Sequence, residues 1–175
     1  MHQVLRLSVA ALAAVALAWV SGVASAQQGP GPAPIKQVKL SEKQVEGFIA
    51  AHKEVVETWD KMQSDKAAES AVKAQLDKIA KKFGFKDHAE YDIVVTNIEM
   101  VMYGLDPQTK AFTEPTEVAK KELEAALADK NLSEKERKRV QEDFTLQLKM
   151  MRPIENASNV DLVKKYYDQI EPLLR

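Results

Sequence analysis

The residues best suited to chemistry in this chain are two histidines, His52 and His88. His52 interrupts an apolar pattern at helical spacing between Phe48 and Val55, where an imidazole is able to ligate a metal or act as a pH-sensitive group. A histidine in such a seam is more often a hydrogen-bonded part of the core, and we favour that interpretation. His88 begins a His-x-Glu-x-Asp sequence, but positions i, i+2 and i+4 do not share a helix face, so we expect a polar helix start. We therefore predict no metal site. If the chain did hold a metal, His52 and His88 would be the candidate ligands.

Methionine thioethers would complete the ligand set if His52 held a cofactor. A Met/His site for copper or haem inside a helical bundle is one hypothesis for function. Methionines at helical spacing usually fill the core instead, so we predict no cofactor. The chain has no cysteine, which excludes thiolate metal sites, disulfides and c-type haem attachment. The methionines that follow the first residue are Met62, Met100, Met102, Met150 and Met151.

Motifs of the common enzyme classes are absent from the sequence. It contains no His-Glu-x-x-His, P-loop, Gly-x-Ser-x-Gly or Rossmann pattern. Its serines sit at helix starts rather than on nucleophile turns. We therefore predict no catalytic residue and a protein that is not an enzyme.

Aromatic residues gather at two breaks in the helical pattern, and they suggest a place for a ligand. Tyr103 and Phe112 flank the longest break, which begins at Leu105, and Phe85 and Tyr91 bracket an earlier turn. One interpretation is a local core that closes each turn. The other is an apolar groove near residues 105–115, formed by these five side chains, that takes a peptide or small molecule.

The N-terminal residues predict export and set the domain boundaries. Arg6 precedes an apolar run from Leu7 to Val20, and small residues end this segment at Ala26. This is the pattern of a cleaved signal peptide over residues 1–26, too short for a comfortable membrane span. Residues 27–40, rich in Gln, Gly and Pro, read as a flexible linker, and residues 41–175 as a single helical domain. We expect a periplasmic or secreted protein without a transmembrane anchor in its mature form.

Helical periodicity dominates the sequence after residue 41. Capping boxes at Ser41, Asp87 and Ser133 mark three helix starts. Pro115 suits a first turn, while Pro153 and Pro172 end or disrupt helices. The expected fold is all-α, a mostly antiparallel bundle of five or six helices. The expected helices cover residues 41–63, 65–83, 87–104, 114–130, 133–151 and 158–170.

Part of the chain resembles an uncharacterised family of small exported α-helical proteins of Gram-negative bacteria. The resembling pieces are Gln44-Val45-Glu46-Gly47-Phe48-Ile49-Ala50-Ala51 after a Leu-Ser start, and Gly84-Phe85 with Ala89-Glu90-Tyr91 at the next helix start. The resemblance covers about half of the expected mature chain. It implies an all-helical exported protein and no known activity.

A second similarity is to the periplasmic stress chaperones with L-T-x-x-Q motifs. Leu40-Ser41-x-x-Gln44 is close to this motif, and Leu132-Ser133-x-x-Glu136 departs from it at the last position. These chaperones are all-helical and bind unfolding clients on a concave cradle. The similarity implies an ATP-independent chaperone as an alternative function.

The balance of basic and acidic residues argues against one class of partner, nucleic acid. The chain has 25 basic and 26 acidic residues without a basic stripe, so we expect no binding to nucleic acid. We predict a non-catalytic periplasmic accessory or binding protein that acts through a helical surface or through the groove near residues 105–115. The chaperone is the first alternative, and a metal or haem binder using His52 and the methionines is the second. The partner is a protein or a small molecule of unknown identity, and homo-oligomers remain an open option.

Overall fold

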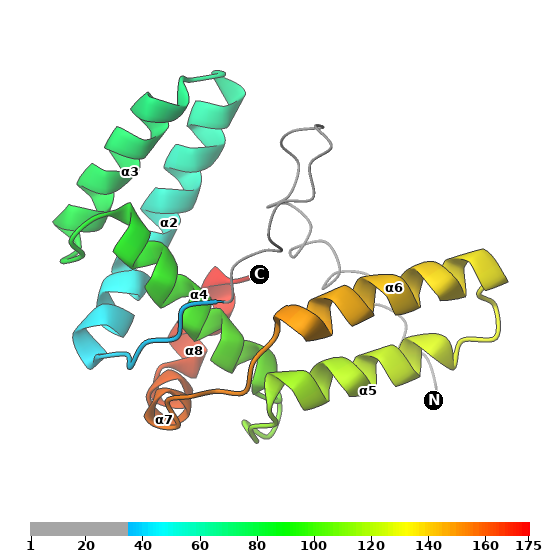
Figure 1. The fold of residues 1–175 in the computed structure, drawn as a ribbon. Coiled ribbons are helices and arrows are strands. Elements are labelled where there is room, and N and C mark those ends of the chain that lie inside the picture. Colours follow the sequence, from blue (N-terminus) through cyan, green and yellow to red (C-terminus); the bar gives the residue numbers. More distant parts are fainter. Residues whose placement is uncertain (1–34) are drawn as a thin grey trace. The chain divides into compact units, whose positions relative to one another are not determined.

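A computed structural model describes residues 35–175 of the chain, apart from the side chain of Met150. This part is all-helical, with seven α-helices, one short 3-10 helix and no β-strand (Figure 1). The expected signal peptide and most of the expected linker lie outside the described residues. Within residues 35–175, no helix combines the length and the apolar character that a membrane crossing needs.

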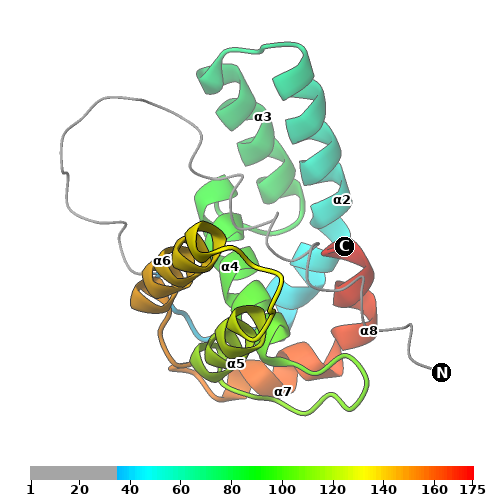
Figure 2. The same ribbon diagram turned by 90° about the vertical axis from the view of Figure 1, so that its right-hand side faces the viewer.

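The first three helices pack on one another in chain order. Helix α2 packs on α3, α3 packs on α4, and α4 returns to contact α2. Ser41 caps α2 and Asp87 caps α4, each accepting a hydrogen bond from the backbone amide three residues on. Figures 1 and 2 show α2 and α3 side by side, joined by a short turn at one end. The bounds are α2 (Glu42–Ser64), α3 (Glu69–Lys82) and α4 (His88–Gly104).

The next two helices, α5 (Pro115–Leu127) and α6 (Glu134–Met150), form a helical hairpin. They pack against each other, and α5 also packs on α4. Figures 1 and 2 show both helices lying side by side. Helix α5 ends three residues before the expected position at residue 130. The guanidinium of Arg137 donates hydrogen bonds to the carbonyls of Leu127 and Asp129, which satisfies backbone groups where the helix stops.

The final expected helix is broken, which raises the number of helices above the expected five or six. It forms α7 (Ser158–Lys165), α8 (Tyr167–Ile170) and a 3-10 turn, η1 (Glu171–Leu173). The break falls at Tyr166, whose backbone leaves the helical range with φ −100° and ψ 8°. Its hydroxyl donates to the Glu42 and Glu46 carboxylates of α2, at 2.6 and 2.9 Å. This long-range contact holds the chain in the bend.

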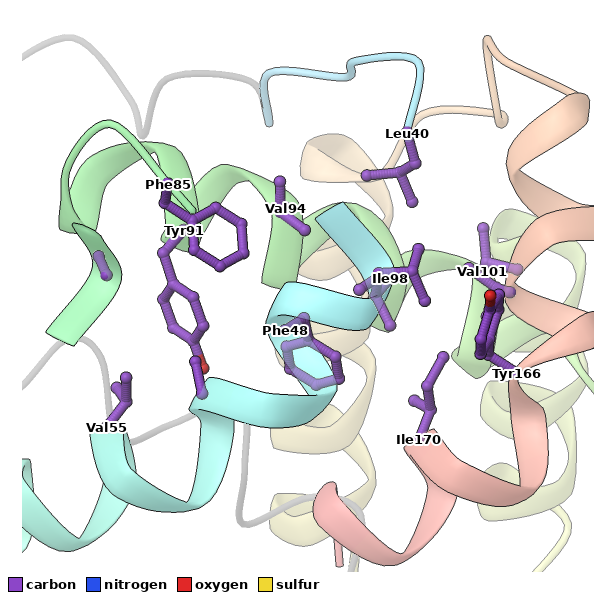
Figure 3. Packing of buried hydrophobic residues seen from close by; sticks show 14 of the residues in the cluster. Leu40, Phe48, Val55, Phe85, Tyr91, Val94, Ile98, Val101, Tyr166 and Ile170 are labelled. Atoms are coloured by element: carbon purple, nitrogen blue, oxygen red, sulfur yellow. The ribbon is translucent and has the colours of Figure 1, made fainter. Parts of the chain in front are cut away.

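The hydrophobic core lies among α2, α3, α4, α7 and α8. Phe48 of α2, Ile98 of α4 and Ile170 of α8 are fully buried, and Figure 3 shows their side chains converging. Burial of such a side chain contributes about 1.5–3 kcal/mol to stability. None of the described side chains of α6 belongs to this core cluster.

Two buried asparagines hold the segment that precedes α2. Asn97 donates to the carbonyl of Lys36 at 2.9 Å and accepts from the amide of Val38 at 3.0 Å. Asn159 accepts from the amide of Leu40 at 2.9 Å and donates to the carbonyl of Val38 at 2.8 Å. Both asparagines are only 2% exposed. The end of the expected linker, residues 36–40, is therefore attached to the helical domain by main-chain hydrogen bonds.

Candidate functional site

The first candidate site surrounds His52, at the junction of α2, α4 and η1. Its Nδ1 lies 2.8 Å from the hydroxyl of Tyr91, and its ring centroid lies 4.8 Å from that of Phe48. Phe85 packs edge-on against Tyr91 at 5.3 Å. Figure 3 shows Tyr91 and Phe85 together beside α2. The sequence predictions concerning His52, Phe85 and Tyr91 thus meet in one aromatic cluster.

Burial sets the protonation state of this cluster. It lowers the pKa of the His52 imidazole, while a hydrogen bond to the backbone of Leu173 acts in the opposite direction. Burial also raises the pKa of Tyr91, so its phenol stays protonated and donates to Nδ1 of His52. The other imidazole nitrogen forms the hydrogen bond with the backbone of Leu173. With both nitrogens in hydrogen bonds, the geometry supports a role for His52 in the core rather than as a ligand.

His88 occupies the first turn of α4, in contact with the same cluster. Its ring stacks on Tyr91 at 5.7 Å, and its Nδ1 lies 3.1 Å from the Asp92 carboxylate. Its backbone amide donates to Asp77 of α3 at 2.9 Å. That bond and the nearby Lys73, which contributes most, lower the pKa of Asp77. Within residues 35–175, no three His, Asp or Glu side chains are grouped so that they hold a metal ion.

The five residues of the expected groove do not come together in one place. Tyr91 and Tyr103 lie on the same helix, twelve residues apart, which separates them by about 18 Å along its axis. Tyr103 is half-buried and donates from its hydroxyl to Glu122 of α5. Burial, followed by that carboxylate, raises the pKa of Tyr103. Tyr103 therefore serves the contact between α4 and α5, apart from Phe85 and Tyr91.

The loop that follows α4 is held by contacts among its own residues. Leu105 is buried and forms an isolated antiparallel bridge with Phe112. The Asp106 carboxylate accepts from the amide of Thr109 at 2.7 Å, a bond that lowers the Asp106 pKa. Gly104 lies so close to the Phe112 ring and the Thr113 carbonyl that an added Cβ would clash with both.

Two surface hollows of the described residues lie away from this loop. One lies beside the segment before α2 and is lined by Ile35, Lys36, Asp92, Ile93 and Thr96. The other lies between α2 and α3 and is lined by Glu54, Glu57, Thr58, Lys61, Met62, Ala71 and Gln75. Both linings mix charged and apolar side chains, and neither includes the residues of the expected groove.

The second candidate site is the α5–α6 hairpin. The sequence pattern predicts these two helices as members of the bundle, with no separate role. Among the described side chains of α6, none is buried. Leu146 is 57% exposed, more than any other large apolar side chain described. We call the partly covered and exposed apolar residues of these two helices the hairpin surface. It consists of Val118, Leu123 and Leu127 of α5, with Val140, Phe144, Leu146 and Leu148 of α6.

Charge is unevenly distributed along α6. Its first half, residues 134–141, carries four basic and two acidic side chains, whereas residues 142–150 carry two acidic and one basic. Two i,i+4 ion pairs span the midpoint, Lys138 with Glu142 and Arg139 with Asp143, each with an N–O distance of 3.8 Å. These side chains are largely exposed, so their pairing within the helix contributes little to stability.

No protein-family model matches this chain, and no curated protein or solved structure is significantly similar to it.

Proposed function

We propose that this chain is a non-catalytic, exported binding protein that engages a protein partner through the hairpin surface. The observation that carries the proposal is the contrast between α6 and the other long helices. Helices α2, α3 and α4 each bury at least four residues, whereas the described side chains of α6 include none that is buried. Apolar side chains left partly or fully exposed beside charged ones are typical of a protein interface.

A single helix covers only part of a neighbouring helix, which explains the geometry of this surface. The apolar residues of α6, such as Val140, Phe144 and Leu148, recur at the helical period and are partly covered by α5. A third helical element would cover the rest. Binding through it would remove apolar area from water, which stabilises a complex by about 25 cal/mol per Å² before the costs of association.

Export and the arrangement of the helices are part of the same proposal. We propose that residues 1–26 are a signal peptide, cleaved after Ala26, and that the protein works in the periplasm or outside the cell. Arg6, the apolar run from Leu7 and the small residues that end at Ala26 support this. We also propose that the helices form a mostly antiparallel bundle, because α2, α3 and α4 pack in chain order.

Photo-crosslinking tests the proposed surface. A photoreactive amino acid is placed at position 146 of the full chain, in its native host, and adducts are identified by mass spectrometry. The matched control carries it at Lys78, an exposed position of α3. We expect discrete protein adducts from position 146 and none from position 78. Equal adducts at the two positions, or none at position 146, would overturn the proposal.

An ATP-independent chaperone is the second candidate, favoured by exposed apolar side chains on a second helix. Val56 of α2 is 42% exposed, in addition to Leu146 of α6. A chaperone with dispersed apolar contacts would suppress aggregation of unrelated unfolded clients at substoichiometric amounts. A specific binding protein would leave that aggregation unchanged, so the aggregation assay distinguishes the two functions.

A further inference from the structure

We propose that the fold closes last between residues 36–46 and residues 153–166, and that this late step keeps the chain open while it is exported. We call these two segments together the terminal contact. The inference goes beyond the proposed binding function and rests only on the export part of that proposal. It follows from the hydrogen bonds between the two segments and from the order in which the helices pack.

Seven hydrogen bonds join the two segments of the terminal contact, between residues that lie 116 to 124 positions apart in the sequence. Gln37 donates to the carbonyl of Pro153 at 2.8 Å and accepts from the amide of Glu155 at 2.9 Å. Asn159 and Tyr166 take part in four of the others. The segment before α2 and the start of α2 are therefore held by residues from the far end of the described chain.

Helices α7 and α8 also complete the hydrophobic core. Helix α7 packs on α4, and η1 packs on α2. Val163 of α7 and Ile170 of α8 are fully buried. Figure 3 shows Ile170 in the same cluster as Phe48 and Ile98. Until these last elements dock, apolar area on α2 and α4 remains exposed to water, so their docking adds stability.

Helices α2, α3 and α4 have short connections, which favour their earlier assembly. Residues 65–68 join α2 to α3, and residues 83–87 join α3 to α4. The entropy lost on closing a loop increases with the length of the loop, and contacts between distant residues slow folding. We therefore expect α2, α3 and α4 to pack in the rate-limiting transition state, with the terminal contact formed after it.

Late closure suits the export of an unfolded chain. The proposed signal peptide has a single arginine, Arg6, and so lacks the twin-arginine pattern that serves folded proteins. A chain exported by the other main route crosses a narrow protein channel without stable tertiary structure. The terminal contact begins at residue 36, ten positions after Ala26, but its partners at 153–166 are synthesised much later. The segment close to the signal peptide therefore lacks these partners until synthesis of the given chain is nearly complete.

Refolding kinetics of the full chain test the order of closure. I170V in α8 and I79V in α3 make the same change at side chains that are 0% and 4% exposed. We expect I170V to raise the unfolding rate by about fivefold and to leave the refolding rate within about twofold of the wild type. I79V should instead slow refolding by about threefold, because its contacts form by the transition state. Stopped-flow measurements in urea give both rates.

N159A provides a second test, because it removes two of the seven hydrogen bonds. It should change the rates in the same way as I170V, mainly through faster unfolding. N131A, at an exposed asparagine, is the matched control and should leave both rates nearly unchanged. Refolding of I170V or N159A that is slowed as much as that of I79V would overturn late closure.

Export is tested separately, so that the two proposals fail in different ways. Cell fractionation followed by N-terminal sequencing should find the chain outside the cytoplasm, beginning at Gln27. A cytoplasmic chain that retains residues 1–26 would overturn export in both proposals. Early formation of the terminal contact in an exported chain would overturn this inference alone, because the crosslinking test of the hairpin surface does not depend on the order of folding.

Discussion

At the scale of single residues, hydrogen bonding determines which polar groups the core accepts. The Tyr91 hydroxyl and the His52 imidazole satisfy each other at 2.8 Å, and no buried side-chain nitrogen or oxygen among the described residues lacks a partner. A paired polar group inside a core contributes modestly to stability, whereas an orphaned one is costly. Loss of either side chain would therefore leave the polar group of the other without its hydrogen-bond partner.

Removal of the Tyr91 hydroxyl should expose this dependence. Y91F keeps the ring but leaves Nδ1 of His52 without its donor, so we expect a loss of about 1–3 kcal/mol in the free energy of unfolding. Urea denaturation measures the change. Y167F is the matched control, because Lys110 contacts the ring of Tyr167 and the ring is retained. An equal effect of both substitutions would show that the hydroxyl of Tyr91 is not the cause.

The lowered pKa of His52 predicts a pH dependence of stability. Because burial lowers the pKa in the folded state, the unfolded chain binds the proton more readily. Stability should therefore fall as the pH drops through the ordinary histidine value near 6.5, and level off below the folded pKa. Urea midpoints measured between about pH 7.5 and pH 5 test this.

H52Q supplies the control for this titration. It retains polar atoms but no group that titrates in the window, so its urea midpoint should vary less with pH than that of the wild type. An unchanged pH dependence in H52Q would assign the effect to another group, with Glu99 as the first to examine because burial raises the pKa of its carboxyl.

The sequence identified some of these residues but not their partners. The spacing around His52 placed it on an apolar seam, because periodicity is a local property. Tyr91 is 39 residues away, so nothing near His52 indicated that a phenol would satisfy it. Asn97 was missed altogether, although a polar residue between Val94 and Ile98 on an apolar face was an available signal.

At the scale of elements, two asparagine side chains provide the extended segment before α2 with the hydrogen bonds that a neighbouring β-strand would otherwise provide. The side chains of Asn97 and Asn159 form hydrogen bonds with backbone groups of residues 36–40. A single extended segment cannot satisfy these backbone groups by itself. The segment thereby brings Leu40 into the core at 5% exposure.

Truncation of either asparagine should release this segment. N97A or N159A leaves buried main-chain groups unpaired, so each should cost about 2–3 kcal/mol, and the double variant less than the sum because both hold Val38. N131A, an exposed amide at the turn of the hairpin, is the control and should change stability by less than about 1 kcal/mol. Thermal unfolding and proteolysis near residue 36 report the outcome. Resistance of N97A to cleavage would contradict the role of Asn97 in holding this segment.

Helix starts with a capping side chain were predictable, whereas the start of α3 at Glu69, which has no side-chain cap, falls four residues after the expected position. Ser41, Asp87 and Ser133 cap their helices as expected, because a cap depends on residues only three positions apart. The end of α5 depends on Arg137, ten residues beyond Leu127, and the break at Tyr166 depends on α2 carboxylates that lie 124 and 120 residues away. Local patterns do not contain that information.

At the scale of the whole described chain, folding energy is concentrated in one region. The core cluster draws on α2, α3, α4, α7 and α8, while α6 packs on α5 and adds nothing to that cluster. Local stability follows buried contacts, so the hairpin belongs to the least protected part of the fold. The all-helical class was predictable from periodicity, but the uneven division of the core was not, since every helix has an apolar face in the sequence.

Hydrogen exchange followed by mass spectrometry tests the central claim most directly, that the hairpin surface is open until a partner covers it. In dilute purified protein, amides of α6 should exchange much faster than those of α4, whose inner face is buried. Addition of the protein captured by crosslinking at position 146 should slow exchange in α6 and leave α4 unchanged. Protection of α6 equal to that of α4 in dilute protein would contradict the account, because it would mean that the hairpin is already closed.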